Sequence, residues 1–171
     1  MSIGLWVRGA RPKTLVTSIA SVMVGAVMAY VHIERSGTCI AIYPEPASCA
    51  TAREQQTLLM DRFWPVTILC LLVALFLQIA VNYANDYSDG IRGTDAGRDT
   101  DESKSGKPQR LTASGLVSAE HVLFAAMICA AIACICGVVA VVLAQAWWLL
   151  AVGAASLLAG WFYTSGKHPY G

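Results

Sequence analysis

Charged residues are scarce in this sequence. Lysine, arginine, aspartate and glutamate make up only 13% of the 171 residues, whereas a soluble globular domain carries about 25%. The net charge is only +1, so the chain has no basic face to neutralise phosphates, and we exclude nucleic acid as a partner. With 56% hydrophobic residues, the chain has too few water-facing groups for a soluble domain, which points to the lipid bilayer.

Cysteine is also sparse, and its six positions form no zinc motif. Cys134 and Cys136 are separated by a single residue, which is not the spacing of a zinc site. The cysteines inside apolar runs are interpreted as small packing residues. Cys39 and Cys49 lie ten residues apart in a more polar segment, and the sequence leaves open whether they form a disulfide.

Three long uncharged runs dominate the rest of the chain. Residues 15–33 and 63–85 each reach the roughly 18–20 residues that cross a bilayer as a helix. The run 122–166 is too long for one crossing, and Trp147 and Trp148 mark a turn at a membrane interface. We predict an all-α, polytopic membrane protein, with a single domain over residues 1–171 and four transmembrane helices at about 15–33, 63–85, 122–144 and 147–166.

The basic residues set the orientation. Three of the twelve, Arg35, Arg53 and Arg62, lie around an outer loop that we expect over residues 36–61. The others lie before the first helix, after the second or after the fourth, which four crossings place on the opposite side. By the positive-inside rule, the N-terminus and the acidic loop over residues 93–117 face the cytoplasm. We therefore expect a multi-pass protein of the plasma membrane.

Two helix starts carry local signals. Pro12 is suited to the first turn of the first crossing, after an amphipathic stretch over residues 1–14 that suits the membrane interface. Ser118 is a typical N-cap residue, and Glu120 two positions later suits the positive end of a helix. We expect helices to begin at both places.

Carboxylates and carboxamides gather where the second apolar run ends. If the run continues as a helix, Asn82, Asp86 and Asp89 lie at i, i+4 and i+7 on one stripe, with Asn85 beside it. Acidic side chains at the end of a membrane helix repel each other and are costly to remove from water, so they need a cation. Oxygen ligands without histidine or cysteine suit Mg²⁺ shared with substrate phosphates. We predict a membrane-embedded site for a metal-bound diphosphate, followed by a polar loop from Gly90.

Five further residues have two interpretations each. Asp95 lies one short turn beyond the acidic stripe, and it either extends the metal site or is solvated. Lys107 and Arg110 either cover a phosphate or only follow the charge rule. Tyr163 and Lys167 are four residues apart and can share a helix face if the helix runs that far, which Gly166 disfavours. Taken alone, that pair is better explained by an aromatic belt with a snorkelling lysine.

These features together carry a resemblance to a known family. The residues that carry it are 82–95, 110–111, 11–15, Tyr163 with Lys167, and 169–171. They resemble the UbiA superfamily of intramembrane aromatic prenyltransferases, and within it the subgroup that acts on 1,4-dihydroxy-2-naphthoate in menaquinone synthesis. The resemblance covers nearly the whole chain, and the asparagine–aspartate block is its most specific part.

The resemblance implies a reaction and a set of roles. The reaction is the Mg²⁺-dependent transfer of a polyprenyl group from polyprenyl diphosphate to 1,4-dihydroxy-2-naphthoate, with decarboxylation, giving demethylmenaquinone. The roles are metal binding by Asp86, Asp89 and Asp95, diphosphate binding by Asn82, Asn85, Lys107 and Arg110, and catalysis by Tyr163, Lys167 and Arg110.

The chain departs from the family pattern in two ways. The superfamily spaces its motif as Asn-x-x-x-Asp-x-x-x-Asp; Asn85 and Asp89 fit, but Gly93 occupies the third position and the acid is displaced to Asp95. Family members also have further helices and a second acidic motif beyond the point where this sequence stops. We therefore expect a fragment, a truncated product or one half of a split enzyme, with a C-terminal half as partner and little activity alone.

Two alternatives come from other classes. Residues 86–90 also fit the start of the motif of CDP-alcohol phosphatidyltransferases, which are Mg²⁺-dependent membrane enzymes. That motif requires Ala-Arg where this chain has Gly93 and Thr94, and its later acid pair is not found. The second alternative is a half that binds a lipid diphosphate without performing chemistry.

Overall fold

Every regular element of the computed structural model is an α-helix within the residues that it describes, which are 3–36, 46–92, 111–112, 115 and 117–164. The helices are α1 (Ile3–Gly9), α2 (Pro12–Ser36), α3 (Pro46–Arg92), α5 (Ala119–Ala144) and α6 (Leu149–Thr164). The predicted all-α class is confirmed.

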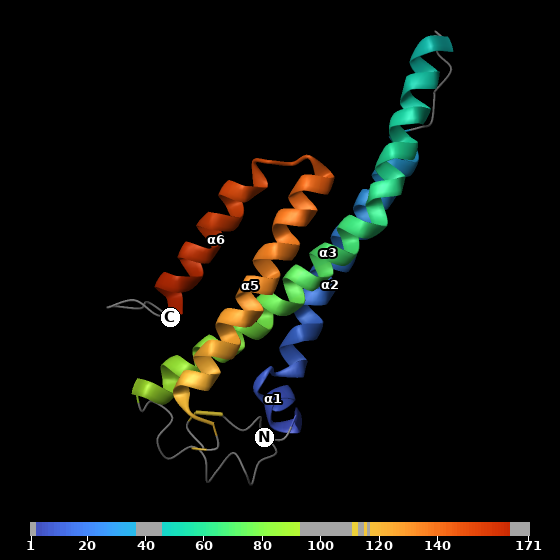
Figure 1. The fold of residues 1–171 in the computed structure, drawn as a ribbon. Coiled ribbons are helices and arrows are strands. Elements are labelled where there is room, and N and C mark those ends of the chain that lie inside the picture. Colours follow the sequence, from blue (N-terminus) through green and yellow to red (C-terminus); the bar gives the residue numbers. More distant parts are fainter. Residues whose placement is uncertain (1–2, 37–45, 93–110, 113–114, 116, 165–171) are drawn as a thin grey trace.

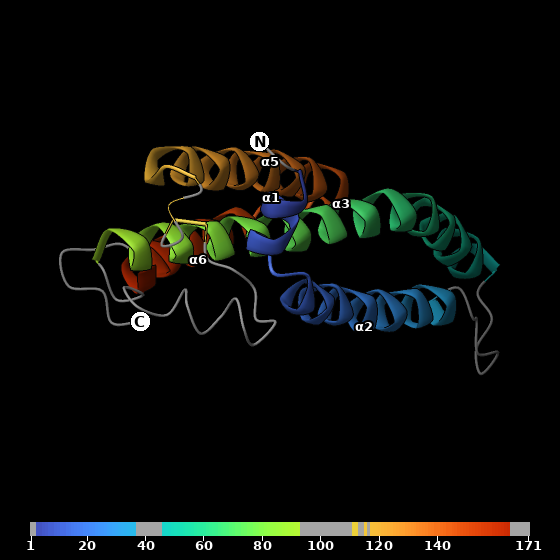
Figure 2. The same cartoon turned by 90° about the horizontal axis from the view of Figure 1, so that it is seen from below.

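Helix α3 is the longest element, and the others are arranged along it (Figure 1). Helices α2 and α5 both pack against α3, and Figure 2 shows them along opposite sides of it. Helix α6 lies beside α5 and also contacts α3, while α1 contacts α3 at Tyr83. One long helix therefore connects all the other elements.

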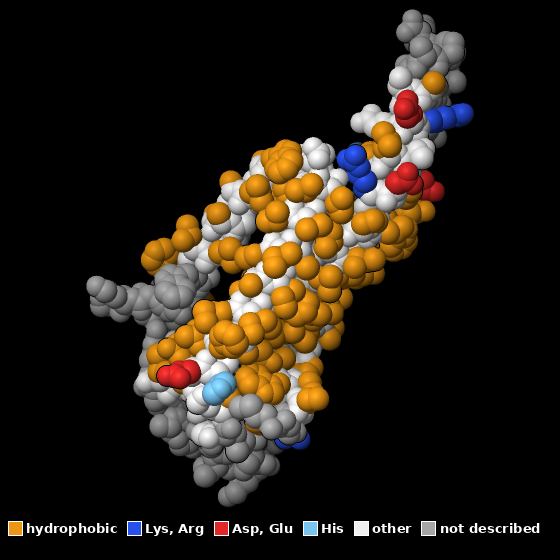
Figure 3. Space-filling view, in the orientation of Figure 1, with side chains coloured by type: hydrophobic (Ala, Val, Ile, Leu, Met, Phe, Trp, Pro, Cys, Tyr) orange, Lys and Arg blue, Asp and Glu red, His pale blue; other side chains and the backbone are white. Residues whose placement is uncertain are grey.

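The surface is that of a membrane protein. Three segments are long and apolar enough to cross a bilayer, within α2, within residues 50–91 of α3, and within α5. Hydrophobic side chains cover most of the described surface in Figure 3, and their exposure suits contact with lipid rather than water. The polytopic membrane class is confirmed, although α6 is shorter than the other three, with 16 residues.

Helix α3 differs from the expected helix at both ends. The expected outer loop over residues 36–61 was wrong for its second part, because α3 already begins at Pro46. Residues 50–60 are polar but rich in strong helix formers such as alanine, glutamine and leucine. The change in polarity therefore marks the limit of the apolar segment and not the start of the helix. At the other end the helix continues past Gly90 to Arg92.

Three local signals are confirmed. Pro12 is the first residue of α2, and Ser118 is the N-cap of α5 with Glu120 in its first turn. The Ser118 hydroxyl binds Nδ1 of His121 rather than a backbone N–H of the first turn. The turn expected near Trp147 and Trp148 lies between α5 and α6, where Gln145 caps α5 in a left-handed conformation with φ of 55°.

Contacts at the far end of α3, which we define as residues 46–63, are few and mostly exposed. The Phe63 ring packs edge-on against Tyr30 of α2, with ring centroids 5.5 Å apart. The guanidinium of Arg62 donates to the carbonyl of Leu143 at 3.3 Å, and the amide of Gln56 donates to the carbonyl of Glu34 at 3.0 Å. Figure 3 shows charged side chains where this end projects beyond α5 and α6.

Candidate functional site

The predicted polar stripe lies on one helix, at the other end of α3. We call residues 78–92 the site end. Since α3 remains helical to Arg92, Asn82 and Asp86 are neighbours one turn apart, and so are Asn85 and Asp89. The two pairs differ in burial. Asn82 is 3% exposed and Asp86 is 2% exposed, whereas Asn85 and Asp89 are half-buried.

Asn82 joins α3 to the junction between α1 and α2. Its Nδ2 donates to the carbonyl of Ala10 at 2.7 Å and to the hydroxyl of Thr14 at 3.0 Å. Its Oδ1 accepts a hydrogen bond from Nε2 of Gln78 at 3.3 Å. Both ends of the carboxamide are therefore held by protein groups.

The junction itself has an unusual backbone. Arg11 adopts a left-handed conformation with φ of 53°, which L residues other than glycine disfavour. The backbone N–H of Arg11 donates to the carbonyl of Arg8 at 3.0 Å, and its carbonyl accepts from the hydroxyl of Thr14 at 2.9 Å. This residue turns the chain sharply, so that α1 folds back onto α3.

Tyr83 fixes α1 in that position. Its hydroxyl donates to the carbonyl of Trp6 at 2.9 Å, and the two rings pack edge-on with centroids 5.6 Å apart. Such an aromatic pair adds to the burial of both rings. Sequence reasoning missed this contact. The Arg11-Pro12 pair was a signal for a break between two helices, because a residue before proline disfavours the right-handed helical conformation.

Asp86 binds a segment that follows it by 25 residues. Its Oδ2 accepts the backbone N–H of Leu111 at 2.7 Å, and Leu111 is fully buried. The Leu111 side chain belongs to the core cluster, together with Ala10, Tyr83, Val117 and Val122. The chain that returns from the acidic loop is thus docked onto the site end of α3.

Two glycines allow this docking. A Cβ atom at Gly9 would lie 2.5 Å from Cδ1 of Leu111, and one at Gly90 would lie 2.4 Å from Cγ2 of Thr112. Both separations are far below a normal contact, so a larger residue at either place requires the neighbour to move.

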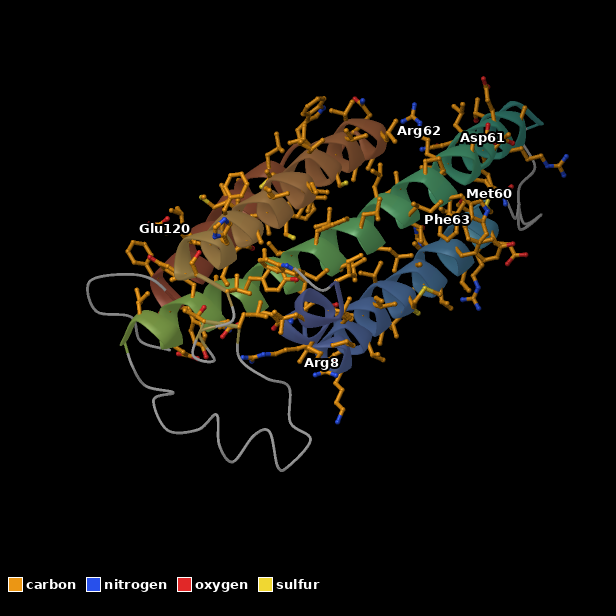
Figure 4. All side chains as sticks on the ribbon, turned by 60° about the horizontal axis from the view of Figure 1, so that its bottom comes forward. Arg8, Met60, Asp61, Arg62, Phe63 and Glu120 are labelled. Carbon is orange, nitrogen blue, oxygen red and sulfur yellow. The ribbon has the colours of Figure 1, made fainter. Side chains whose placement is uncertain are left out.

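Charged residues lie at both ends of α3. Figure 4 shows Arg8 of α1 at the site end of α3, and Asp61 and Arg62 at the far end.

Tyr163 is the one described member of the expected catalytic group. It lies near the end of α6 and is 49% exposed, and Figure 1 shows this end of α6 at the same end of the bundle as Arg92. The other residues of interest lie outside the described residues: Asp95, Lys107, Arg110 and Lys167. Whether Cys39 and Cys49 form a disulfide stays untested, because Cys39 also lies outside the described residues.

The oxygen atoms available at the site end are of the type that binds a hard cation. Carboxylate and amide oxygens of Asn85, Asp86 and Asp89 are the ligands that Mg²⁺ prefers. Within the part of the chain that the structure describes, no three histidine, cysteine, aspartate or glutamate side chains gather as a metal site. Asp86 and Asp89 supply two carboxylates, and Asp95 lies outside that part.

Comparisons with known proteins point to one family. The model of the UbiA prenyltransferase family matches residues 57–171. The chain is 39% identical over 170 residues to a 1,4-dihydroxy-2-naphthoate octaprenyltransferase of Mycobacterium tuberculosis, covering 99% of this chain and 46% of that protein. A protein of the same name from Mycobacterium leprae is 35% identical, with the same coverage, and one from Escherichia coli is 28% identical, covering 97% and 45%. The chain spans about half the length of these curated relatives. No solved structure matches it.

Proposed function

The chain belongs to the UbiA prenyltransferase family, and from this we propose that it takes part in prenyl transfer to 1,4-dihydroxy-2-naphthoate in menaquinone synthesis. The donor is a polyprenyl diphosphate and the product has the ring skeleton of demethylmenaquinone. The observation that carries the proposal is the polar stripe on the last turns of α3, where the apolar segment of this helix ends with Asn82, Asn85, Asp86 and Asp89 on adjoining faces. The names of the relatives supply the substrates.

We assign the diphosphate to the site end of α3. Asp89 with Asn85 would hold Mg²⁺, and Asp95 would complete the set. Asp86, which the sequence placed in the same set, already binds the N–H of Leu111, so we do not assign it to the metal here. When bound, the metal neutralises the diphosphate and makes it a better leaving group. Lys107, Arg110 and Lys167 are assigned to the remaining negative charge, because cations aimed at a developing anion lower the barrier.

The chemistry required of the protein is modest. The allylic C–O bond of the donor breaks and the electron pair leaves with the diphosphate. A carbon of the electron-rich naphthoate ring attacks the allylic cation, and the ring loses its carboxylate as carbon dioxide. We assign Tyr163 to orienting or shielding the reacting centre. Because α3 and α5 contain segments that are long and apolar enough to cross a bilayer, the prenyl tail would remain in lipid during transfer.

We also propose that the site end faces the cytoplasm at the plasma membrane. Arg8, Arg11 and Lys13 lie at this end of the described chain, and Arg35, Arg53 and Arg62 lie at the other. The excess of basic residues comes from the loop over residues 93–110 and from Lys167, and the positive-inside rule, which counts lysine and arginine, assigns that side to the cytoplasm.

An acid at each end of α3 provides a matched test. The chain is co-expressed with the C-terminal half of a relative, and transfer of a radiolabelled prenyl group to dihydroxynaphthoate is measured in membranes. Asp89→Ala should lower the rate by about a hundredfold or more, as loss of a key charge-stabilising group does. The control is Asp61→Ala, an exposed acid of the same helix, and it should leave the rate unchanged.

Other outcomes decide against the proposal. Equal transfer after chelation of divalent metal, or full activity of Asp89→Ala, excludes the metal site. Transfer from a CDP-alcohol instead supports a phosphatidyltransferase. If neither reaction occurs but the membranes still bind a lipid diphosphate in a Mg²⁺-dependent way, the chain is a binding half without chemistry.

A further inference from the structure

We propose that Asn82 and Asp86 are positioning residues, which hold two distant segments of the chain against α3 and leave Asn85 and Asp89 to face the metal. This inference rests on the proposed function for its consequence, but its geometry is independent of it. It divides the sequence-predicted stripe into a buried pair that holds the protein together and a half-buried pair that substrate can reach.

The first segment is the junction between α1 and α2. Asn82 binds the carbonyl of Ala10 and the hydroxyl of Thr14, and these two residues flank Arg11. The same Thr14 hydroxyl donates to the carbonyl of Arg11. The left-handed backbone of Arg11 is therefore held on both sides by a chain of hydrogen bonds that begins at Gln78. Asn82 thereby fixes the position of the basic segment over residues 8–13 against α3.

The second segment is the end of the acidic loop. Asp86 accepts the N–H of Leu111, which belongs to the peptide bond that joins Leu111 to Arg110. The close approaches of Leu111 to Gly9 and of Thr112 to Gly90 hold the same segment from two other sides. Asp86 is therefore an anchor for the end of the loop that carries Lys107 and Arg110.

Burial separates the two pairs chemically. A diphosphate reaches a ligand only where that ligand borders open space, and Asn82 and Asp86 are almost completely covered. Asn85 and Asp89, on the adjoining face of the helix, are partly open. Coordination by Asp86 would require Leu111 to leave a position in which it is fully buried.

The experiment compares isosteric and truncated variants at the two aspartates. The full chain is placed in lipid nanodiscs. Hydrogen exchange of the Leu111 amide is followed by mass spectrometry with single-residue fragmentation, and binding of inorganic pyrophosphate in the presence of Mg²⁺ is followed by calorimetry. Asp86→Asn keeps an acceptor oxygen for the Leu111 amide and loses the charge, whereas Asp86→Ala loses both. Asp89→Asn is the matched change one turn away.

The inference makes a distinct expectation for each variant. Asp86→Ala should speed exchange of the Leu111 amide by about tenfold or more, because a buried N–H loses its acceptor, and it should weaken pyrophosphate binding. Asp86→Asn should keep the slow exchange and bind within about threefold of the unmodified chain, since a neutral acceptor still holds the amide. Asp89→Asn should keep the slow exchange and lose Mg²⁺-dependent binding.

Two results would overturn the inference. One is slow Leu111 exchange in Asp86→Ala, which means that the carboxylate does not hold this segment. The other is loss of Mg²⁺-dependent binding in Asp86→Asn while exchange stays slow, which makes Asp86 a metal ligand. If the unmodified chain binds no pyrophosphate, the proposed function fails, and the exchange of Asp86→Ala still decides whether Asp86 anchors Leu111.

Discussion

The two ends of α3 use the same kinds of polar side chain in opposite ways. At the site end, Asn82 and Asp86 are buried and bind the backbone of Ala10 and Leu111. At the far end, Gln56 and Arg62 also donate to backbone carbonyls, but these two hydrogen bonds are exposed. Loss of such a hydrogen bond lowers stability strongly at the site end and only slightly at the far end, because water can replace the missing partner only at an exposed site.

Packing follows the same contrast. At the site end, Leu111 fills the space beside Gly9, and Thr112 lies directly against Gly90. Towards the far end, α2 and α3 leave between them a cavity of about 460 Å³, bordered by Gly25, Ala29, Phe63 and other residues. The site end of α3 is thus packed against a later segment of the same chain, whereas a cavity borders α3 towards its far end. We expect the site end to be rigid and sensitive to substitution, and the far end to be tolerant.

The largest effect is expected for the buried amide. Asn82→Ala removes the donor to the carbonyl of Ala10, which then stays buried without that bond, and should lower the free energy of unfolding by about 2–3 kcal/mol. Gln56→Ala removes an exposed amide that donates to the carbonyl of Glu34 and should change it by less than about 0.5 kcal/mol. Denaturant unfolding in detergent micelles measures both. Equal losses would show that the two ends do not differ.

Glycine substitutions should give the next largest difference. Gly90→Ala places a methyl group where Thr112 already lies, and should destabilise the protein by about 1–2 kcal/mol as overpacking does. Gly25→Ala meets nothing within 4 Å and should stabilise α2 by up to about 1 kcal/mol through helix propensity. Thermal unfolding in the same micelles compares them. A stabilising Gly90→Ala would mean that Thr112 is not held against α3.

A small effect is also expected for Arg62. Its bond to the carbonyl of Leu143 is exposed, so Arg62→Ala should lower the free energy of unfolding by less than about 1 kcal/mol. The same variant should leave the exchange of the Leu111 amide unchanged, because that amide binds Asp86 at the site end of α3. Faster exchange at Leu111 in this variant would show that the two ends are coupled.

The class and several boundaries of the fold were predictable from the sequence. Apolar runs of bilayer length, Pro12, Ser118 and the segment around Trp147 are local signals, and each acts where it stands in the chain. The first part of α3 was not predictable in the same way. Polarity distinguishes a lipid-facing segment from a water-facing one, but it does not distinguish a helix from a loop. The pattern therefore did not show that the helix already begins at Pro46, before the apolar segment.

The sequence predicted that the polar stripe lies on one helix, but not that the stripe divides into a buried pair and a half-buried pair. The helical period placed Asn82, Asp86 and Asp89 together, since it is a local property of the sequence. The burial of Asn82 and Asp86 depends on Ala10, 72 residues earlier, and on Leu111, 25 residues later. No local pattern contains those partners. The nearest signal was Gly90, whose lack of a side chain makes the close approach of Thr112 feasible.

The separation between Asp86 and Leu111 also has a consequence for biogenesis. Ala10 is already synthesised when Asn82 leaves the ribosome, so that bond can form at once. Leu111 follows Asp86 by 25 residues, which at translation rates of about 5–20 residues per second is a delay of about 1–5 seconds. During that interval the carboxylate lacks the backbone N–H of Leu111 as a donor. Asp86 can form its bond to Leu111 only after Leu111 has been synthesised. The final placement of α3 therefore depends on the emergence of the segment that precedes α5.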